Sequence, residues 1–170
     1  MKKETSPIIF GIDPGTRSTG YGIIQAAYPR MHVLDFGCIR PPPHLDTAQK
    51  YLTLFNALDL LLEKYSPDYV VVESQFVYKN VQSALKLGKA QGMALLAAAR
   101  RSICVREVAP KKAKLAVCGN GSASKQQVQK MIQLLLHLPS LPQPEDAADA
   151  LALAIALAHS LTHPLGKNYV

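Results

Sequence analysis

The chain has 170 residues, of which 48% are hydrophobic and 18% charged, as in a folded globular domain and unlike a disordered chain. No stretch has the layout of a signal peptide or the length of a membrane span, and the three separated cysteines show neither zinc nor disulfide spacing. These features predict a cytoplasmic protein with one domain over residues 1–170, a core at about 8–161 and short flexible ends.

The net charge of +7 is unevenly distributed. Eleven of the 19 Lys and Arg residues lie between Lys79 and Lys130, together with a single acid, Glu107. The rest of the chain is therefore net acidic. This asymmetry favours binding to a polyanion such as nucleic acid, whereas the alternative is a set of basic helix faces that are merely solvated.

Hydrophobic patterning predicts a mixed α/β fold in the order β-β-β-α-β-α-β-α-α. The expected strands are 8–12, 19–28, 32–40, 69–72 and 104–108, and the first three form an antiparallel meander. The expected helices are 47–65, capped by Asp46 or Thr47, then 81–101, 125–138 and 145–161, with a short helical piece at 111–117. These elements make a five-stranded sheet with helices on both faces.

Four acids stand in unusual settings. Asp13 and Glu73 each close a strand that is too apolar to lie at the surface, and Asp146 and Asp149 share one face of the last helix. Asp13 has an alternative role as a turn cap, and Asp146 as a first-turn acid that interacts with the helix dipole. Asp149 is less easily explained in this way, because it lies a full turn further into an otherwise apolar helix.

If these four carboxylates converge, their mutual repulsion requires a cation. Oxygen ligands of this kind suit hard divalent ions such as Mg²⁺ or Mn²⁺, and no His or Cys grouping competes as a soft-metal site. An acidic centre in a basic protein fits metal-assisted hydrolysis of a nucleic-acid phosphodiester, in which two ions activate water and stabilise the leaving oxygen.

Five ordered stretches carry a resemblance to a known family. They are GIDPGTRSTGYG (11–22), VVVESQF (70–76), KNVQSALKLGKAQG (79–92), KLAVCGNGSASKQQV (114–128) and EDAADALALA (145–154). On these motifs the chain resembles the RuvC Holliday-junction resolvases of the RNase H-like superfamily. The resemblance implies an RNase H-like fold in which Asp13, Glu73, Asp146 and Asp149 are both the catalytic residues and the metal ligands.

The same resemblance implies a homodimeric endodeoxyribonuclease of homologous recombination and DNA repair. It would use Mg²⁺, for which Mn²⁺ may substitute, with two ions per active site, to nick two opposed strands of a four-way junction symmetrically. The products would carry 5′-phosphate and 3′-hydroxyl ends, and RuvA and RuvB would be its branch-migration partners.

The resemblance also indicates DNA-binding residues. Phe76 matches an aromatic that stacks on junction bases, although a core position would explain it too. Lys114 and Lys125 match basic residues that handle DNA or assist catalysis, and the loop 119–122 offers backbone donors for a phosphate. The remaining candidates lie on or before a DNA-facing or dimer-facing helix: Lys79, Asn80, Lys86 and Lys89.

Two positions depart from the family pattern. Ser74 stands where many relatives have Gln, and Gln91 stands where an Arg is common, which removes one phosphate contact. Gly15, Gly20 and Gly22 are expected to give the first hairpin room beside the DNA backbone.

Other classes of function stay open at this stage. Asp13-Pro14-Gly15-Thr16 also fits the phosphate-binding hairpin of an actin-like or sugar-kinase-like ATPase, although one lobe of 170 residues is too short for that architecture. A different RNase H-like nuclease and a non-catalytic junction-binding protein are the nearer alternatives.

Overall fold

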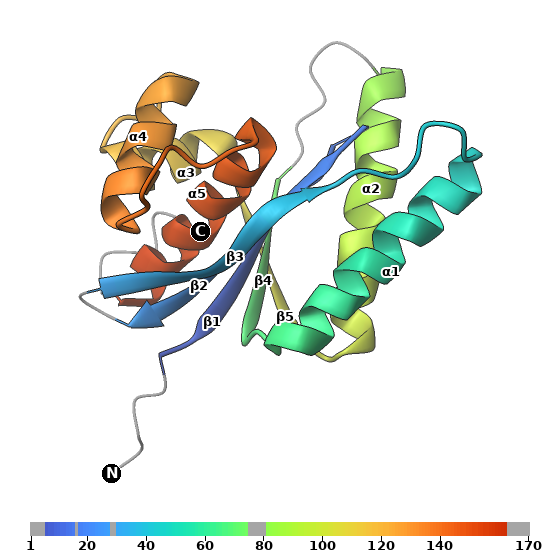
Figure 1. The fold of residues 1–170 in the computed structure, drawn as a ribbon, viewed down its shortest axis with the longest axis horizontal. Coiled ribbons are helices and arrows are strands. Elements are labelled where there is room, and N and C mark those ends of the chain that lie inside the picture. Colours follow the sequence, from blue (N-terminus) through green and yellow to red (C-terminus); the bar gives the residue numbers. More distant parts are fainter. Residues whose placement is uncertain (1–5, 16, 28–29, 75–80, 163–170) are drawn as a thin grey trace.

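A computed structural model describes residues 6–15, 17–27, 30–74 and 81–162 (Figure 1). One five-stranded sheet has the order β3-β2-β1-β4-β5. Neighbours β1/β2 and β2/β3 are antiparallel, and β1/β4 and β4/β5 are parallel, so the predicted mixed sheet is confirmed. The strands are β1 (Ile8–Asp13), β2 (Thr19–Ala27), β3 (Arg30–Ile39), β4 (Tyr69–Glu73) and β5 (Cys104–Val108).

Helices cover both faces of this sheet, as predicted (Figure 1). On one face lie α1 (Thr47–Tyr65) and α2 (Val81–Arg100), and on the other lie α3 (Pro110–Cys118), α4 (Lys125–Leu135) and α5 (Glu145–Thr162). The short helical piece expected at 111–117 is the nine-residue helix α3, which adds one helix to the predicted order. Helix α4 ends three residues earlier than predicted, because His137 has a positive φ of 51° and cannot continue the helix.

The central strands are buried because helices pack on both of their faces. Val70, Val71 and Val72 of β4 have no exposed surface, which explains the continuous β-branched run in the sequence. Along β1 the side chains alternate, so that Ile9 packs toward α5 while Phe10 packs toward α1 and α2. β1 therefore forms the buried middle of the sheet.

Glycines allow α5 to pack unusually close to the sheet. A Cβ at Gly11 would overlap the carbonyl oxygen of Ala150, and one at Gly20 would overlap the carbonyl oxygen of Asp146. A Cβ at Gly22 would approach the side chain of Leu151 to 2.7 Å. The expectation that Gly20 and Gly22 make room for DNA is therefore wrong, because the space they leave is filled by this helix.

The space beside the Cα of Gly15 is also filled by the protein itself. A Cβ there would overlap the carbonyl oxygen of Ser18, so the missing side chain lets the turn between β1 and β2 close on itself. The close contact that requires this glycine is thus one within the hairpin, and the expectation that it makes room beside a DNA backbone stays a prediction.

Candidate active site

The first two acids are brought together by strand pairing. β1 and β4 run parallel with Ile12 opposite Val72, so the next residue of each strand, Asp13 and Glu73, lies at the same edge of the sheet. Both strands are apolar up to that point, and the carboxylates follow where the strands leave the core. The local sequence thus places two acids at neighbouring strand ends.

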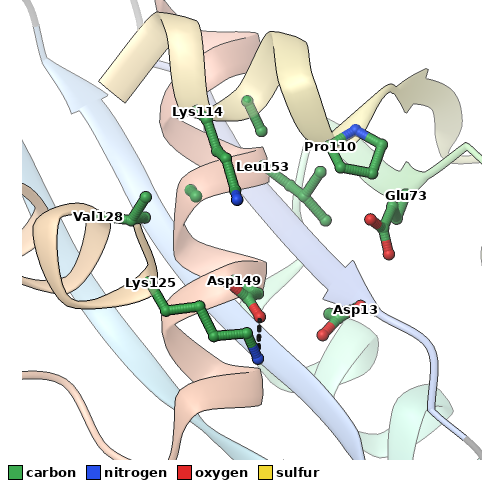
Figure 2. A pocket seen from close by; sticks show the side chains of 10 residues that line it. Asp13, Glu73, Pro110, Lys114, Lys125, Val128, Asp149 and Leu153 are labelled. Atoms are coloured by element: carbon green, nitrogen blue, oxygen red, sulfur yellow. Dashed lines mark ion pairs between the residues drawn. The ribbon is translucent and has the colours of Figure 1, made fainter. Parts of the chain in front are cut away.

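The last helix adds a third acid to this edge. Helix α5 crosses β1 and β2 at their glycines, with the backbone of Asp146 against Gly20, and Gly20 is the antiparallel partner of Asp13. One turn further along, the Asp149 side chain points into the same pocket as those of Asp13 and Glu73 (Figure 2).

This pocket, of about 240 Å³, is lined by both acidic and basic side chains. Lys114 of α3 and Lys125 of α4 extend into it opposite Asp13 and Glu73, and Lys125 forms an ion pair with Asp149 (Figure 2). The remaining walls are mostly apolar: Pro110, Ala113, Val128, Ala152 and Leu153. The arrangement leaves two positive and three acidic groups facing a space that has apolar sides.

Asp146 has a different orientation from the other three predicted acids. Its carboxylate accepts a hydrogen bond from the hydroxyl of Ser18 and lies 3.8 Å from the Sγ of Cys38. It does not line the pocket, although its charge contributes to raising the pKa of both Asp13 and Asp149. Three of the four predicted acids are thus gathered in the pocket, and the fourth lies beside it.

Burial and crowding favour the protonated form of Asp13, Glu73 and Asp149. Burial, followed by the negative charges of Glu73 and Asp149, raises the pKa of Asp13 to about 8. Burial also raises the pKa of Glu73 and that of Asp149 above their ordinary values. Without a compensating cation, the group of acids cannot be fully ionised near neutral pH.

The two lysines only partly offset this crowding. The Nζ of Lys125 lies 3.1 Å from Glu145 and 3.8 Å from Asp149, and its charge lowers the pKa of Asp149 against the effect of burial. The charge of Lys114 acts in the same direction on Glu73. Because the pKa values of Asp13, Glu73 and Asp149 remain raised, the two lysines do not fully compensate the negative charge that these acids would carry when ionised.

The carboxylate oxygens of the pocket suit a hard divalent cation, but their present positions do not form a complete coordination site. The polar side chains that line the pocket are carboxylates and lysines, and oxygen donors are what Mg²⁺ and Mn²⁺ prefer. Within the described ranges, no group of three or more His, Cys, Asp or Glu side chains is arranged so that it could hold a metal ion. The carboxylates would have to turn toward a common point.

Two of the other predicted DNA contacts, Lys86 and Lys89, do not line this pocket. Both are exposed on α2. Phe76, Lys79 and Asn80 lie outside the described residues.

At the positions that depart from the family pattern, the backbone N–H of Ser74 donates to Val108, and Gln91 is a buried residue of α2. The loop 119–122 already uses one of its backbone donors internally, since the N–H of Ser122 donates to Asn120.

Sequence reasoning missed the partners of Asp146. Ser18 and Cys38 are far from Asp146 in the sequence, and only the packing of α5 on the sheet brings them together. A hydroxyl five residues after Asp13, in the turn that follows β1, was the one available signal.

Comparisons with known proteins agree with one another. The family model described as "Crossover junction endodeoxyribonuclease RuvC" matches residues 9–159. The chain is 53% identical over 151 residues to the protein of that name from Protochlamydia amoebophila, covering 89% of this chain and 90% of the relative. It is 47% identical over 155 residues to that from Heliobacterium modesticaldum, covering 91% and 96%.

A solved structure of Thermus thermophilus RuvC superimposes with a TM-score of 0.82 and 29% identity, over 94% of this chain and 96% of that one. The T. thermophilus RuvC structure in complex with a Holliday junction substrate gives 0.80 and 28%, over 91% and 92%. The yeast mitochondrial Holliday junction resolvase Ydc2 shares the fold, with a TM-score of 0.62 at 16% identity, over 98% and 87%.

Proposed function

Because this chain belongs to the RuvC family of crossover junction endodeoxyribonucleases, we propose that it resolves Holliday junctions in homologous recombination and DNA repair. The reaction is hydrolysis of two opposed strands at symmetric positions, which leaves 5′-phosphate and 3′-hydroxyl ends. The match over residues 9–159 and the likeness to a RuvC structure that holds a Holliday junction substrate support this proposal.

The catalytic residues in this proposal are Asp13, Glu73, Asp146 and Asp149. The observation that carries it is the convergence of three partly buried carboxylates, two from strand ends and one from α5, in one pocket with two lysines. Asp146 would join them by turning away from Ser18, since its backbone is already held against β2 by Gly20.

Mg²⁺ is the proposed cofactor, with Mn²⁺ as a substitute and two ions per active site, held by the same four carboxylates. Such ions, when bound, activate water and stabilise the charge on the leaving oxygen. The raised pKa values of Asp13, Glu73 and Asp149 support the proposal, because a group of acids that holds protons in the absence of metal gains most from a divalent cation.

The lysines bind and orient the DNA in this scheme. Lys114 and Lys125 lie across the pocket from Asp13 and Glu73, so a phosphate that enters there meets positive charge on the side away from these two acids. Lys125 is now paired with Glu145 and Asp149, and both pairs involve partly exposed side chains that water can replace. The DNA-binding roles of Phe76, Lys79, Asn80, Lys86 and Lys89 stay predictions.

Symmetric cleavage of two strands calls for two active sites, so we include a homodimer in the proposal. Exposed leucine and valine side chains on one face of α2 support it: Val81, Leu85 and Leu96 are 65%, 61% and 55% exposed. RuvA and RuvB as partners and a cytoplasmic location remain predictions. No helix in the described part of the chain has the length and apolar character to cross a membrane.

The proposal is tested by offering the purified chain a synthetic four-way junction, a linear duplex of the same sequence and an RNA–DNA hybrid, each with and without Mg²⁺. We expect paired nicks in the junction alone, and only with the metal. Equal cutting of the duplex or hybrid would instead indicate another RNase H-like nuclease. Tight junction binding without cutting would indicate a non-catalytic junction-binding protein.

A further inference from the structure

A second, larger cleft of about 420 Å³ opens on the other side of the turn between β1 and β2. It is formed by this turn, the residues that follow β3 and the first turns of α1. Its floor contains Thr19 and Leu54, which are 2% and 3% exposed, and Pro41 and Tyr51 lie along its walls. None of these residues takes part in the acidic pocket.

The charged residues that line this cleft are all positive. Arg17 comes from the turn, Arg40 directly follows β3 and Lys50 lies in the first turn of α1. Among the residues that the structure describes, no acid forms an ion pair with any of them. The nearby Asp46 is used at the start of α1, where its carboxylate accepts from the backbone N–H of Gln49 at 2.8 Å.

These three basic residues come from the part of the chain that is net acidic. Outside the basic span from Lys79 to Lys130 the chain has eight basic residues and eleven acids. Three of those eight basic residues nevertheless line a single cleft, and none of the described residues that line it is an acid. The elements that supply them are separated in the sequence, so the fold and not a local charge run creates this positive surface.

One hydrogen bond connects the cleft to the acid that lies beside the pocket. Ser18 lines the cleft, and its hydroxyl donates a hydrogen bond to Asp146, one of the four predicted catalytic acids. Gly15, another lining residue, comes two positions after Asp13. Asp13 of the acidic pocket and the lining residues Gly15, Arg17 and Ser18 of the cleft therefore follow one another along the same turn.

We infer that this cleft binds the phosphodiester backbone of the DNA strand that is cut, next to the nucleotide held at the acids. The inference rests on the proposed nuclease function and adds a second contact site to it. Positive charge supplied by three separate elements suits a run of successive phosphates, and the apolar walls with Tyr51 suit the sugar and base edges of an unpaired strand.

The test uses the full chain with Asp13→Asn in the background, so that binding is measured without cutting. Arg17→Gln, Arg40→Gln and Lys50→Gln are combined, and junction affinity is measured by fluorescence anisotropy over a range of salt concentrations. Each lost phosphate contact lowers the slope of log affinity against log salt by about 0.7–0.9. We expect the triple variant to lose about 2 to 3 from this slope. Lys64→Gln, at the opposite end of α1, is the matched control and should leave the slope unchanged.

A second measurement identifies the ligand. Junctions that carry one neutral methylphosphonate at a time near the cut site should bind the parent protein more weakly at the contacted positions. The triple variant should be insensitive to the same substitutions. Retained sensitivity, or an unchanged salt slope, overturns the inference. Binding of inorganic phosphate or ATP to the parent protein but not to the triple variant, without any methylphosphonate effect, also overturns the inference. That result would indicate that the cleft binds a small anion.

Failure of the cleft and failure of the proposed function give different results. If the parent chain cuts junctions but the triple variant binds them normally, only the cleft inference is lost. If the parent chain neither binds nor cuts junctions, both are lost. Thermal melting of the triple variant excludes misfolding, and Arg40→Lys, which keeps the charge, should retain most of the parent affinity.

Discussion

At the residue scale, the structure changes the interpretation of Asp13. The turn-cap alternative accounts for an aspartate after a strand, but it does not account for a carboxylate packed against Glu73 and Asp149 with a pKa raised to about 8. Ionising this buried carboxyl group beside two other acids destabilises the folded state unless a cation compensates the charge. Perturbed acids gathered in a pocket are typical of functional sites.

Replacing Asp13 by Asn should separate binding from cutting. The amide keeps the shape of the side chain but removes one negative ligand, so we expect junction affinity within about twofold of the parent and loss of Mg²⁺-dependent nicking by at least a factor of about 100. Gel assays of binding and cleavage measure the two effects. Asp68→Asn is a suitable control, because the Asn oxygen can still accept the hydrogen bond from the N–H of Ile8 and the position lies at the opposite end of β4 from Glu73. Nicking at the parent rate would refute the assignment of Asp13.

The raised pKa of Asp13 also predicts how stability depends on pH without metal. Between its usual value of 3.8 and about 8, the folded protein holds a proton that the unfolded chain has released. The free energy of unfolding contributed by this group therefore falls as pH rises through that window.

Urea unfolding in the presence of a chelator at pH 5 and pH 8 measures this contribution. The loss of stability toward pH 8 should be smaller in Asp13→Asn than in the parent, and Mg²⁺ should stabilise the parent more at pH 8 than at pH 5. Equal pH dependence in the two proteins would contradict the prediction.

At the element scale, the packing of α5 on β1 and β2 sets the geometry of the site. The strands present glycines where the helix crosses, and the helix is apolar on nearly all sides because both its neighbouring helices and the sheet bury it. The position of Asp149 relative to Asp13 thus depends on residues that carry no chemistry of their own.

Gly20→Ala tests this dependence. The new methyl group would meet the carbonyl oxygen of Asp146, which cannot move without displacing α5, so we expect destabilisation of about 1–3 kcal/mol and impaired cleavage. Gly88→Ala in α2 is the contrasting control, since nothing lies within 4 Å of the added Cβ and alanine favours a helix by roughly 0.8–1.0 kcal/mol. Urea unfolding compares the two variants. A Gly20→Ala protein as stable as the parent would mean that the close packing is not required.

At the scale of the whole molecule, the two faces of the sheet carry different surface features. Helices α3, α4 and α5 surround the acidic pocket, whereas α1 and α2 cover the opposite face and leave apolar side chains exposed on α2. A surface of this kind is a candidate for contact between two copies of the chain, which would give the two active sites that paired cleavage requires.

Leu85→Glu on this surface should weaken the dimer. A charge placed in an apolar interface is left unpaired, so we expect a shift toward monomer in analytical ultracentrifugation and a loss of paired nicks in favour of single ones. Leu134→Glu is the matched control, because Leu134 is 67% exposed but belongs to α4 on the other side of the sheet. A parent chain that is monomeric at micromolar concentration would disprove the proposed dimer.

The sequence by itself determined most elements and predicted the four acids as site residues. Runs of β-branched residues define β1 and β4, the period of leucines defines α1, and an acid that ends an apolar strand is visible without a structure. These signals are local, because each depends on neighbours within a few positions along the chain.

Only the tertiary structure decided what surrounds each acid. The association of Asp146 with Ser18 and Cys38, the pairing of Gly11 and Gly20 with α5, and the grouping of Arg17, Arg40 and Lys50 in one cleft join residues far apart in the sequence. A glycine in a strand looks the same whether DNA or a helix lies beside it. Its meaning depends on which surface packs there, and packing is a property of the whole fold.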